Sequence, residues 1–454
     1  MGTLPRVGVT VGVLVLIAVL AVVLRLALGS PATVTPLHGN ENYSGILPVD
    51  LLRQPIADTA PNAEQLRRGQ YLVAAGDCMS CHLRDGGEPL AGGLGLNTPF
   101  GVIYTPNITS DKETGIGDWT ADQFYRAMHA GIDDEGSNLY PAFPYPWFTL
   151  VSREDDDAIL AFLKTTPAVK YSPLNNDLPF PLSIRSAVKG WNLLNFRAHE
   201  FEADTSRSAE WNRGAYLVNG LGHCGGCHTP KNALGADKSS RELQGGTLDS
   251  WVAPDLTANE RTGLGSWSID DVVEYLGTGR NAHAGAGGAM ADVITYSTSL
   301  MSDADRHAMA VYLKSRAASP SVAGTEPDAG AMHRGAAIYS DACASCHLEN
   351  GVGQPRYFPP LGPNAMLQQA DPLGLEHLIL AGGRIGTSPT RPSPMTMPSF
   401  AWKLTDQEVA DVSTFIRNSW GNRAAPVSVS DVRSARKKLN LDVVHLTANS
   451  GDQN

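Results

Sequence analysis

The sequence has no excess of basic side chains. Its 454 residues carry 35 Lys and Arg against 46 Asp and Glu, which gives a formal net charge of −11. Binding to nucleic acid needs a basic stripe that neutralises phosphates, and no such stripe runs along this chain. Nucleic acid is therefore excluded as a partner.

The sequence also lacks the side-chain groupings of most enzymes. It holds no paired catalytic carboxylates, no nucleophile with a neighbouring base and no phosphate-binding glycine loop. The run Gly285–Gly288 is rich in glycine, but no strand–helix pattern flanks it, so it is not a dinucleotide fingerprint. We therefore expect no substrate-oxidising site within this chain.

No cysteine is left over for a structural disulfide, because all six lie in three copies of Cys-x-x-Cys-His. The copies are formed by Cys78, Cys81 and His82, by Cys224, Cys227 and His228, and by Cys343, Cys346 and His347. On a helical turn this spacing lets two thiols bond to a porphyrin edge while the imidazole reaches the iron. A zinc site would need further ligands, and a redox disulfide motif does not require the histidine. The pattern predicts three covalent haems c.

Internal repeats divide the chain into three modules around these motifs. An Arg-Gly pair precedes each motif, at Arg68, Arg213 and Arg334. The first two modules then repeat "TPNIT" or "APDLT" and "TGIGDW" or "TGLGSW". Each module ends in a predicted helix that opens at Ser152, Ser302 or Thr405, with an acidic residue three positions later, as in a capping box. Each module should clamp one haem between its first and last helices.

The predicted fold is mainly α, with three tandem class I cytochrome c-like domains after one N-terminal transmembrane helix. The boundaries are an anchor or signal at 1–30, an extended linker at 31–60, module 1 at 61–170, a connecting segment at 171–207, module 2 at 208–318, a linker at 319–330, module 3 at 331–422 and a C-terminal tail at 423–454.

An apolar run from Val7 to Leu24 follows Arg6 and precedes Arg25. Its length suits an uncleaved membrane anchor with the short basic end in the cytoplasm, although "LALGSPA" offers a signal-peptide cleavage site as the alternative. Either reading exports the rest of the chain. We expect the haem domains on the periplasmic side of a bacterial inner membrane.

A haem iron in an electron carrier usually takes a second axial ligand, and methionine raises its reduction potential. The loop before the last helix offers Met290 in module 2. In module 3 the same loop offers Met397, with Met395 as competitor. Met301 and Met309 lie at or inside a helix and are predicted to be core residues.

Module 1 departs from this pattern. At the distance from His82 where the other modules place methionine stands Phe143, in the aromatic stretch "NLYPAFPYPWFTLVS". Met79 lies inside the attachment turn, on the wrong side of the iron. Three outcomes stay open: Met128 binds, His129 gives bis-imidazole ligation, or the iron is five-coordinate.

Other segments have less definite roles. The Pro-rich and aromatic segment from Tyr171 to Arg207 is predicted to pack across domains or onto a partner, and a quinone crevice there is one hypothesis. Trp119, Trp267 and Trp402 are candidates to line haem faces. "VSVSDVRSARKKLNLDVVHL" in the tail predicts an amphipathic helix, either on the surface or against a membrane or partner.

The stretches "SAEWNRGAYLVNGLGHCGGCHTPKNALG", "TGLGSW" and "MPSFAWKLTDQEVADVSTFIRNSWGN" resemble the three-haem cytochrome c subunit of membrane-bound bacterial dehydrogenases. The resemblance spans about residues 60 to 422. It implies a subunit that passes electrons from a catalytic subunit to ubiquinone. Family members often show "YPAMPY" where this chain has Phe143, so the departure concerns the ligand of haem 1.

"TGRNAHAGAGGAMADVI" and "YPAFPY" are more similar to the cytochrome partners of molybdenum and iron–sulfur aldehyde dehydrogenases. Quinohaemoprotein (PQQ) alcohol dehydrogenase and flavin-dependent sugar dehydrogenase partners follow closely. Two further hypotheses are a haem enzyme or sensor that uses an open haem 1, and a cytochrome subunit of a terminal oxidase.

Overall fold

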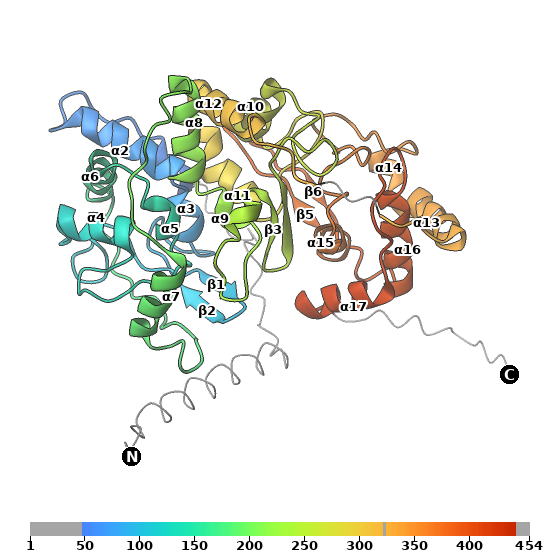
Figure 1. The fold of residues 1–454 in the computed structure, drawn as a ribbon, viewed down its shortest axis with the longest axis horizontal. Coiled ribbons are helices and arrows are strands. Elements are labelled where there is room, and N and C mark those ends of the chain that lie inside the picture. Colours follow the sequence, from blue (N-terminus) through green and yellow to red (C-terminus); the bar gives the residue numbers. More distant parts are fainter. Residues whose placement is uncertain (1–47, 321–323, 442–454) are drawn as a thin grey trace, which may run out of the picture.

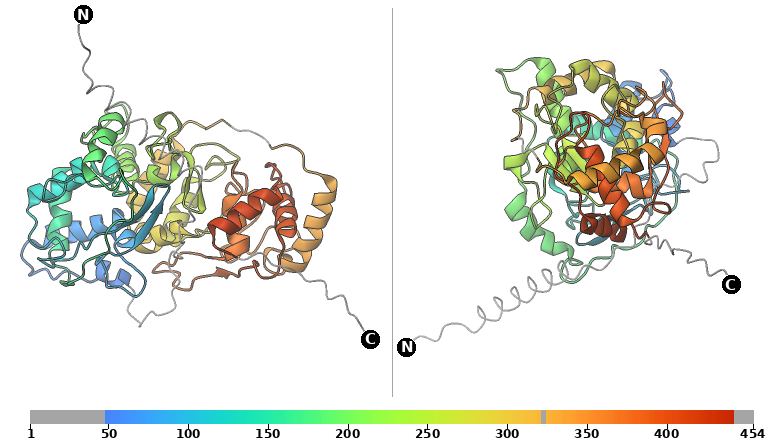
Figure 2. Two further views of the ribbon diagram at one scale, coloured as in Figure 1. Left: turned by 90° about the horizontal axis from the view of Figure 1, so that it is seen from below. Right: turned by 90° about the vertical axis from the view of Figure 1, so that its right-hand side faces the viewer.

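The computed structural model describes residues 48–320 and 324–441. The predicted anchor at 1–30 lies outside this range, and no helix within the range is long and apolar enough to cross a membrane. The described chain is mainly helical, as predicted, and its modules lie in a row from module 1 at one end to module 3 at the other (Figures 1 and 2).

One pair of crossed helices organises each module. The pairs are α2 (Ala63–Ala75) with α6 (Arg153–Leu163), α8 (Ala209–Asn219) with α12 (Asp303–Lys314), and α13 (Ala329–Ala342) with α16 (Asp406–Arg417). A glycine sits at each crossing. A Cβ on Gly69, Gly214 or Gly335 would lie 1.9, 2.0 or 2.2 Å from a backbone oxygen of the partner helix. The glycine of the Arg-Gly repeat is therefore explained by the close contact between the backbones of the first and last helices.

The arginine of each repeat binds an aspartate on the same partner helix. Arg68 Nε lies 2.7 Å from Asp155 Oδ1, and Arg213 Nη2 lies 2.7 Å from Asp305 Oδ2. In module 3, Arg334 Nε lies 2.7 Å from Asp411 Oδ2, one helical turn further along. Each ion pair joins the first helix of its module to the last.

Shorter elements fill the space between these pairs. The further helices are α3 (Cys78–Cys81), α4 (Ala121–Ala130), α5 (Tyr145–Phe148), α7 (Val188–Asn195), α9 (Gly225–His228), α10 (Ile269–Thr278), α11 (Ala289–Tyr296), α14 (Ala344–His347), α15 (Leu373–Ala381) and α17 (Val429–Lys438). The 3-10 turns are η1 (Pro48–Leu52), η2 (Arg185–Ala187), η3 (Ser239–Arg241) and η4 (Thr298–Leu300). The antiparallel hairpins pair β1 (Gly95–Thr98) with β2 (Gly101–Tyr104), β3 (Gln244–Leu248) with β4 (Trp251–Asp255), and β5 (Gly383–Arg384) with β6 (Thr396–Met397).

Modules 1 and 2 share one hydrophobic core, whereas module 3 has its own. Leu72 and Ile159 of module 1 belong to the same buried cluster as Leu217 and Met309 of module 2. The separate cluster of module 3 includes Tyr339 and Val409. The chain therefore packs as a two-module unit joined to a single module.

Two tyrosines cross the seam between modules 1 and 2 in a reciprocal way. Tyr71 Oη donates to Asp305 Oδ2 of module 2 at 2.5 Å, and Tyr216 Oη donates to Asp155 Oδ2 of module 1 at 2.6 Å. Both tyrosines stand three residues after the arginine of the Arg-Gly repeat, where module 3 has Ala337. The same arginine–aspartate pair thus holds a module together and joins it to its neighbour.

Asp305 makes this seam sensitive to acid. Burial raises the pKa of Asp305, but the hydrogen bonds from Arg213 and Tyr71 outweigh burial and hold the pKa below its usual range. A lowered native pKa stabilises the fold above the unfolded value of about 4, and this contribution is lost as the pH falls through the native pKa. Asp305→Asn should cost about 2–3 kcal/mol at pH 7 and flatten the fall in melting temperature between pH 5 and 2. Asp303→Asn, on the exposed side of the same helical turn, should change both by far less. An unchanged acid profile in Asp305→Asn would contradict this account.

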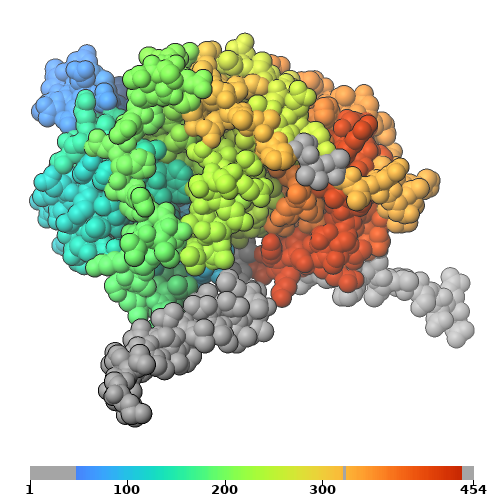
Figure 3. All heavy atoms as spheres, viewed as in Figure 1, coloured from blue at the N-terminus to red at the C-terminus, as the bar shows by residue number. Residues whose placement is uncertain are grey.

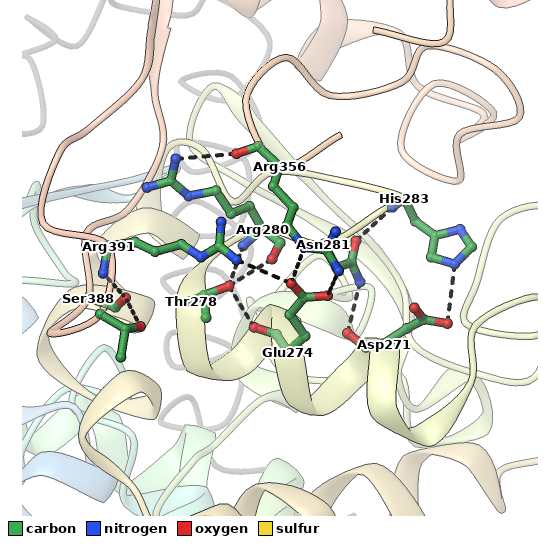
Figure 4. A network of polar contacts seen from close by, with 10 residues as sticks. Asp271, Glu274, Thr278, Arg280, Asn281, His283, Arg356, Ser388 and Arg391 are labelled. Carbon is green, nitrogen blue, oxygen red and sulfur yellow. Dashed lines mark hydrogen bonds and ion pairs between the residues drawn. The ribbon is translucent and has the colours of Figure 1, made fainter. Parts of the chain in front are cut away.

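Module 3 joins module 2 through polar contacts (Figure 4). The carboxylate of Glu274 on α10 accepts hydrogen bonds from Nε and Nη2 of Arg356 in module 3, at 2.5 and 3.1 Å. It also accepts one from Nη2 of Arg391 at 3.4 Å. Arg280 of module 2 donates to the backbone oxygens of Arg356 and Ser393 at 3.3 and 3.1 Å. Apolar contacts complete the junction, because Trp251 of module 2 stacks on His377 of module 3 at 3.7 Å between ring centroids and Val252 of module 2 packs on the module 3 core.

The connecting segment is packed, as the sequence predicted, rather than free. Asp177 exchanges backbone hydrogen bonds with Val102 of module 1 at 2.9 Å in each direction. Trp191 on α7 donates from Nε1 to the backbone oxygen of Leu234 in module 2 at 2.8 Å. The segment therefore bridges the outer surfaces of both modules.

The predicted tail also forms a helix with a buried side. Helix α17 packs on α15 and α16, and it buries Val432, Ala435 and Arg436. Arg436 Nε binds Asp406 Oδ1 at 2.7 Å, and its Nη1 donates to the backbone oxygen of Ala401 at 3.2 Å. These contacts place α17 against the loop that follows Met397.

Candidate functional site

Each Cys-x-x-Cys-His motif forms a short helical turn directly after the first helix of its module. The turns are α3, α9 and α14, with His82 at the C-terminal cap of α3. None of the six cysteines forms a disulfide. The thiols are half-buried except that of Cys346, which is exposed. The local geometry matches what the motif spacing predicts.

Each motif histidine makes the same second contact. The Nδ1 atoms of His82, His228 and His347 lie 2.7, 2.6 and 3.1 Å from the backbone oxygens of Pro106, Pro254 and Pro359, respectively. A carbonyl can only accept, so Nδ1 carries the proton and Nε2 keeps its lone pair. This second contact fixes the tautomer and the ring orientation that a metal ligand needs.

The electrostatics of these rings favour the neutral form. Burial lowers the pKa of His82 to about 4, and the hydrogen bond to Pro106 opposes only part of this shift. Burial also lowers the pKa of His228 and His347. A neutral imidazole is the form that binds iron.

The surroundings of the motif cysteines favour the protonated thiol over the thiolate. Burial raises the pKa of Cys78 and of Cys224 to about 12, and that of Cys343 to about 11. A reactive redox motif requires a stabilised thiolate. No group of three or more His, Cys, Asp or Glu side chains in the described ranges could hold a metal ion by itself. The donor set fits a porphyrin held by two thioethers and one histidine.

The proline carbonyls were not among the residues singled out from sequence. Pro106 lies in "TPNIT" and Pro254 in "APDLT", so the repeats between modules already marked them. Pro359 lies in "YFPPLG", which does not share the pattern of the other two stretches. The sequence repeat marks Pro106 and Pro254, but it does not say what they do. Their role follows from the short distance between each carbonyl oxygen and Nδ1 of the motif histidine.

The predicted sixth ligands lie in the segments before the last helices, but in a helix and a strand rather than in the predicted loops. Met290 is near the start of α11 and packs, half-buried, on the core of modules 1 and 2. Met397 lies in β6 and packs on the core of module 3. Met301 and Met309 are buried core residues, as predicted. Ligation by Met290 and Met397 stays a prediction.

Module 1 places its candidates differently. Met128 is buried near the end of α4, within the shared core. The ring of His129 stacks on Tyr125 at 4.9 Å, and its Nδ1 lies 3.4 Å from Thr149 Oγ1. Phe143 packs edge-to-face on Phe148 at 5.5 Å. Ligation by His129 would require the ring to leave this stack, whereas Met128 is already in the core.

The attachment turns of modules 1 and 2 are covered across the seam. A Cβ on Gly225 of α9 would lie 3.0 Å from Nε1 of Trp147, which belongs to module 1. In return, α11 of module 2 packs on α3, and Ser297 Oγ donates to the backbone oxygen of Ala75 at 3.4 Å. Burial raises the pKa of Cys81, and so do the neighbouring Asp77 and then Cys227 of module 2.

Comparison with known proteins agrees with this geometry. The cytochrome c family model matches residues 66–167 and 332–420. The gluconate 2-dehydrogenase cytochrome c subunit of Pantoea cypripedii is 41% identical over 84% of this chain and 92% of its own. The chain belongs to the family of dehydrogenase cytochrome c subunits.

Other members of the family show the same range of similarity. The cytochrome c subunit of alcohol dehydrogenase (quinone) from Gluconobacter oxydans is 41% identical over 82% of each chain. The fructose dehydrogenase cytochrome subunit of Gluconobacter japonicus is 36% identical over 84% of this chain and 85% of its own. The predicted resemblance is confirmed at this level, and cytochrome c domains imply covalent haem c. The narrower match to the aldehyde dehydrogenase type stays a prediction.

Proposed function

We propose that this cytochrome subunit carries three haems c and passes electrons from a dehydrogenase catalytic subunit to ubiquinone, on the periplasmic side of a bacterial inner membrane. The observation that supports the proposal most directly is the threefold recurrence of one donor set. In each module two thiols and a histidine, oriented by a proline carbonyl, occur together on one turn.

Bound haem supplies reversible one-electron chemistry at iron. The cysteines of each motif would hold the group covalently, and the histidine would bind its iron through Nε2. The proline carbonyl keeps the imidazole neutral and oriented. The first two sites are partly covered, because α11 and Trp147 pack on the turns from the neighbouring module. No acid–base residue is needed in this role.

We propose a molybdenum and iron–sulfur aldehyde dehydrogenase as the catalytic partner, on the motifs around Met290 and Phe143. A PQQ alcohol dehydrogenase or a flavin-dependent sugar dehydrogenase is the second candidate, which the names of the relatives favour. Purification of the detergent-solubilised complex through a tag on this chain tests both. The expected result is a co-purified subunit that reduces the haems on addition of acetaldehyde, ethanol or D-gluconate, with onward reduction of ubiquinone. A partner that contains only an oxidase core would favour a terminal-oxidase subunit instead.

A haem enzyme or sensor is the alternative that Phe143 supports, because its phenyl ring is no ligand. An open iron in module 1 should bind carbon monoxide in the reduced protein and shift the optical spectrum of about one haem in three. Three low-spin spectra without a carbon monoxide shift would argue against this alternative and for a ligand such as Met128.

The number of haems per chain can be measured directly, and it tests the proposal of three haems. The wild-type chain should give three haems by the pyridine haemochrome assay and by intact mass. Replacing both cysteines of one motif by alanine should lower the count to two, because thioether bonds can no longer form there. The pair Cys343 and Cys346 is the best target, since module 3 has its own core. A wild-type count of two would contradict the proposal.

A further inference from the structure

The glycine-rich run Gly285–Gly288, which is not a dinucleotide fingerprint, lies where module 3 packs on module 2. Gly386 of module 3 donates from its backbone nitrogen to the backbone oxygen of Ala286 at 3.0 Å. A Cβ on Gly285 would lie 2.8 Å from Cδ1 of Ile385. The small residues of the run therefore let the chain of module 3 approach closely. In Figure 3 the atoms of module 3, orange to red, lie directly against those of module 2.

The same contact continues onto the start of α11, next to the predicted ligand Met290. A Cβ on Gly386 would lie 2.6 Å from the backbone oxygen of Ala291, which follows Met290 in the chain. The backbone nitrogen of Thr387 donates to Thr295 Oγ1 at 3.1 Å. Thr295 Oγ1 in turn donates to the backbone oxygen of Ala291 at 2.8 Å. The first turn of α11 is thus fixed against the chain of module 3.

A second contact from module 3 reaches this segment through a tryptophan. A Cβ on Gly288 would lie 2.6 Å from the ring of Trp251 in β4. The same ring stacks on His377 of α15, with 3.7 Å between the ring centroids. Trp402, which the sequence placed among the candidates to line a haem, is 74% exposed instead. The tryptophan that links module 2 to module 3 is therefore Trp251.

Strand β4 connects this tryptophan to the other predicted ligand of module 2. Trp251 is the first residue of β4, and Pro254 is the fourth. The backbone oxygen of Pro254 lies 2.6 Å from Nδ1 of His228. Module 3 therefore contacts the two segments that carry and orient the predicted axial ligands of module 2.

On the side of module 3, the contact belongs to the β-ribbon that carries its own predicted ligand. Strand β5 pairs with β6, and Gly383 lies opposite Met397 in this register. The backbone nitrogen of Ile385 donates to the backbone oxygen of Met395 at 2.9 Å, so the pairing reaches the residue before Gly386. One interface thus joins the segments that carry the predicted methionine ligands of two modules.

We propose that Gly386 and Thr295 are positioning residues for the haem of module 2, because they fix the segment that carries Met290 against module 3. The packing of module 3 thereby sets how Met290 meets the iron, and with it the reduction potential of that haem. The inference rests on the proposed function, since it requires bound haems and Met290 as a ligand. It adds that the potential of module 2 depends on two modules rather than one.

Spectroelectrochemical titration of the full chain in the purified complex tests this proposal. Gly386→Ala adds a methyl group for which the backbone of Ala291 must move. The matched control is Gly287→Ala, whose Cβ would lie 3.9 Å from the backbone oxygen of Arg384, an ordinary contact. Met290→Leu identifies the redox transition and the iron–methionine absorption band that belong to module 2.

We expect Gly386→Ala to weaken that absorption band and to lower the potential of that transition, because methionine ligation raises the potential. The ratio of oxidised to reduced haem at a fixed potential should rise about tenfold, which is about 59 mV for one electron. Gly287→Ala should change the ratio less than about twofold. Thermal unfolding of both variants separates this effect from stability, because a merely structural role would lower the melting temperature and leave the module 2 transition at its wild-type potential.

A second pair of variants tests the same contact without adding volume to the interface. Thr295→Val keeps the shape of the side chain but removes the hydroxyl that binds Thr387 and Ala291, whereas Thr295→Ser keeps the hydroxyl. Thr295→Val should shift the module 2 transition in the same direction as Gly386→Ala, and Thr295→Ser should restore the wild-type potential. This pair decides the matter if Gly386→Ala does not fold.

The remaining outcomes separate the failure of this inference from the failure of the proposed function. A wild-type chain without three haems contradicts the proposed function, and this inference with it. If three haems are present but Met290→Leu leaves every transition unchanged, the inference alone fails. It also fails if Gly287→Ala shifts the module 2 transition as far as Gly386→Ala does, or if Gly386→Ala shifts only the transition that Met397→Leu identifies.

Discussion

Gly214→Ala should destabilise the two-module unit strongly, although it adds one methyl group. Its Cβ would lie 2.0 Å from the backbone oxygen of Ala308, so α8 and α12 must move apart. Moving these two packed helices apart should lower the free energy of unfolding by about 3 kcal/mol or more, because side chains of both helices lose their packing in the shared core. Thermal unfolding followed by circular dichroism should show a drop of roughly 5–10 °C.

The matched control is the same substitution in an open helix. Gly190 lies in α7, and nothing approaches its Cβ position within 4 Å. Gly190→Ala should therefore raise stability by up to about 1 kcal/mol, since alanine is the better helix former. Equal melting temperatures for the two variants would show that the crossing glycine is not needed for close contact.

Arg436→Met should unfold or loosen module 3. The side chain of Arg436 is 2% exposed and that of Asp406 is 9% exposed, so the variant leaves a buried carboxylate without its main partner. Breaking such a pair costs about 3–5 kcal/mol. The variant also loses the bond to the Ala401 backbone, in the loop that follows Met397. Denaturant unfolding and the optical spectrum of module 3 measure both effects.

A neighbouring arginine provides the comparison for this prediction. Arg433 lies 3.4 Å from the same carboxylate, but its side chain is 70% exposed. Arg433→Met should cost less than about 1 kcal/mol, because water screens the charge pair. If Arg433→Met and Arg436→Met were equally mild, α17 would be a dispensable appendage rather than part of the module.

The sequence was sufficient for the elements that depend on local pattern. The attachment turns follow from motif spacing, and the last helices begin at Ser152, Ser302 and Thr405, as predicted. Each of these side chains accepts a hydrogen bond from the backbone three residues on. The capping box is complete at Thr405, where Glu408 returns to the cap.

The pairing of modules could not be predicted from the same pattern. Ser152 and Ser302 are followed by Asp155 and Asp305, which look like the acidic partners of a capping box. In the fold both carboxylates turn instead to an arginine of their own module and a tyrosine of the neighbouring one. The sequence shows the aspartate three residues after the capping serine. It does not show the arginine and tyrosine that bind this aspartate in place of the cap, because they lie far away in the chain. For the same reason the exposure of Trp402 and the burial of α17 required the structure.

The interlocked seam also sets an order of assembly. The turn that bears Cys78 and Cys81 is covered by α11, which comes much later in the chain. A cofactor joined to these thiols must be in place before that cover closes, and only after export if the thioethers form in the periplasm. We therefore expect cofactor attachment in the first module to precede the packing of α11 on its turn, whereas among the described residues no helix of another module packs on the turn of the third.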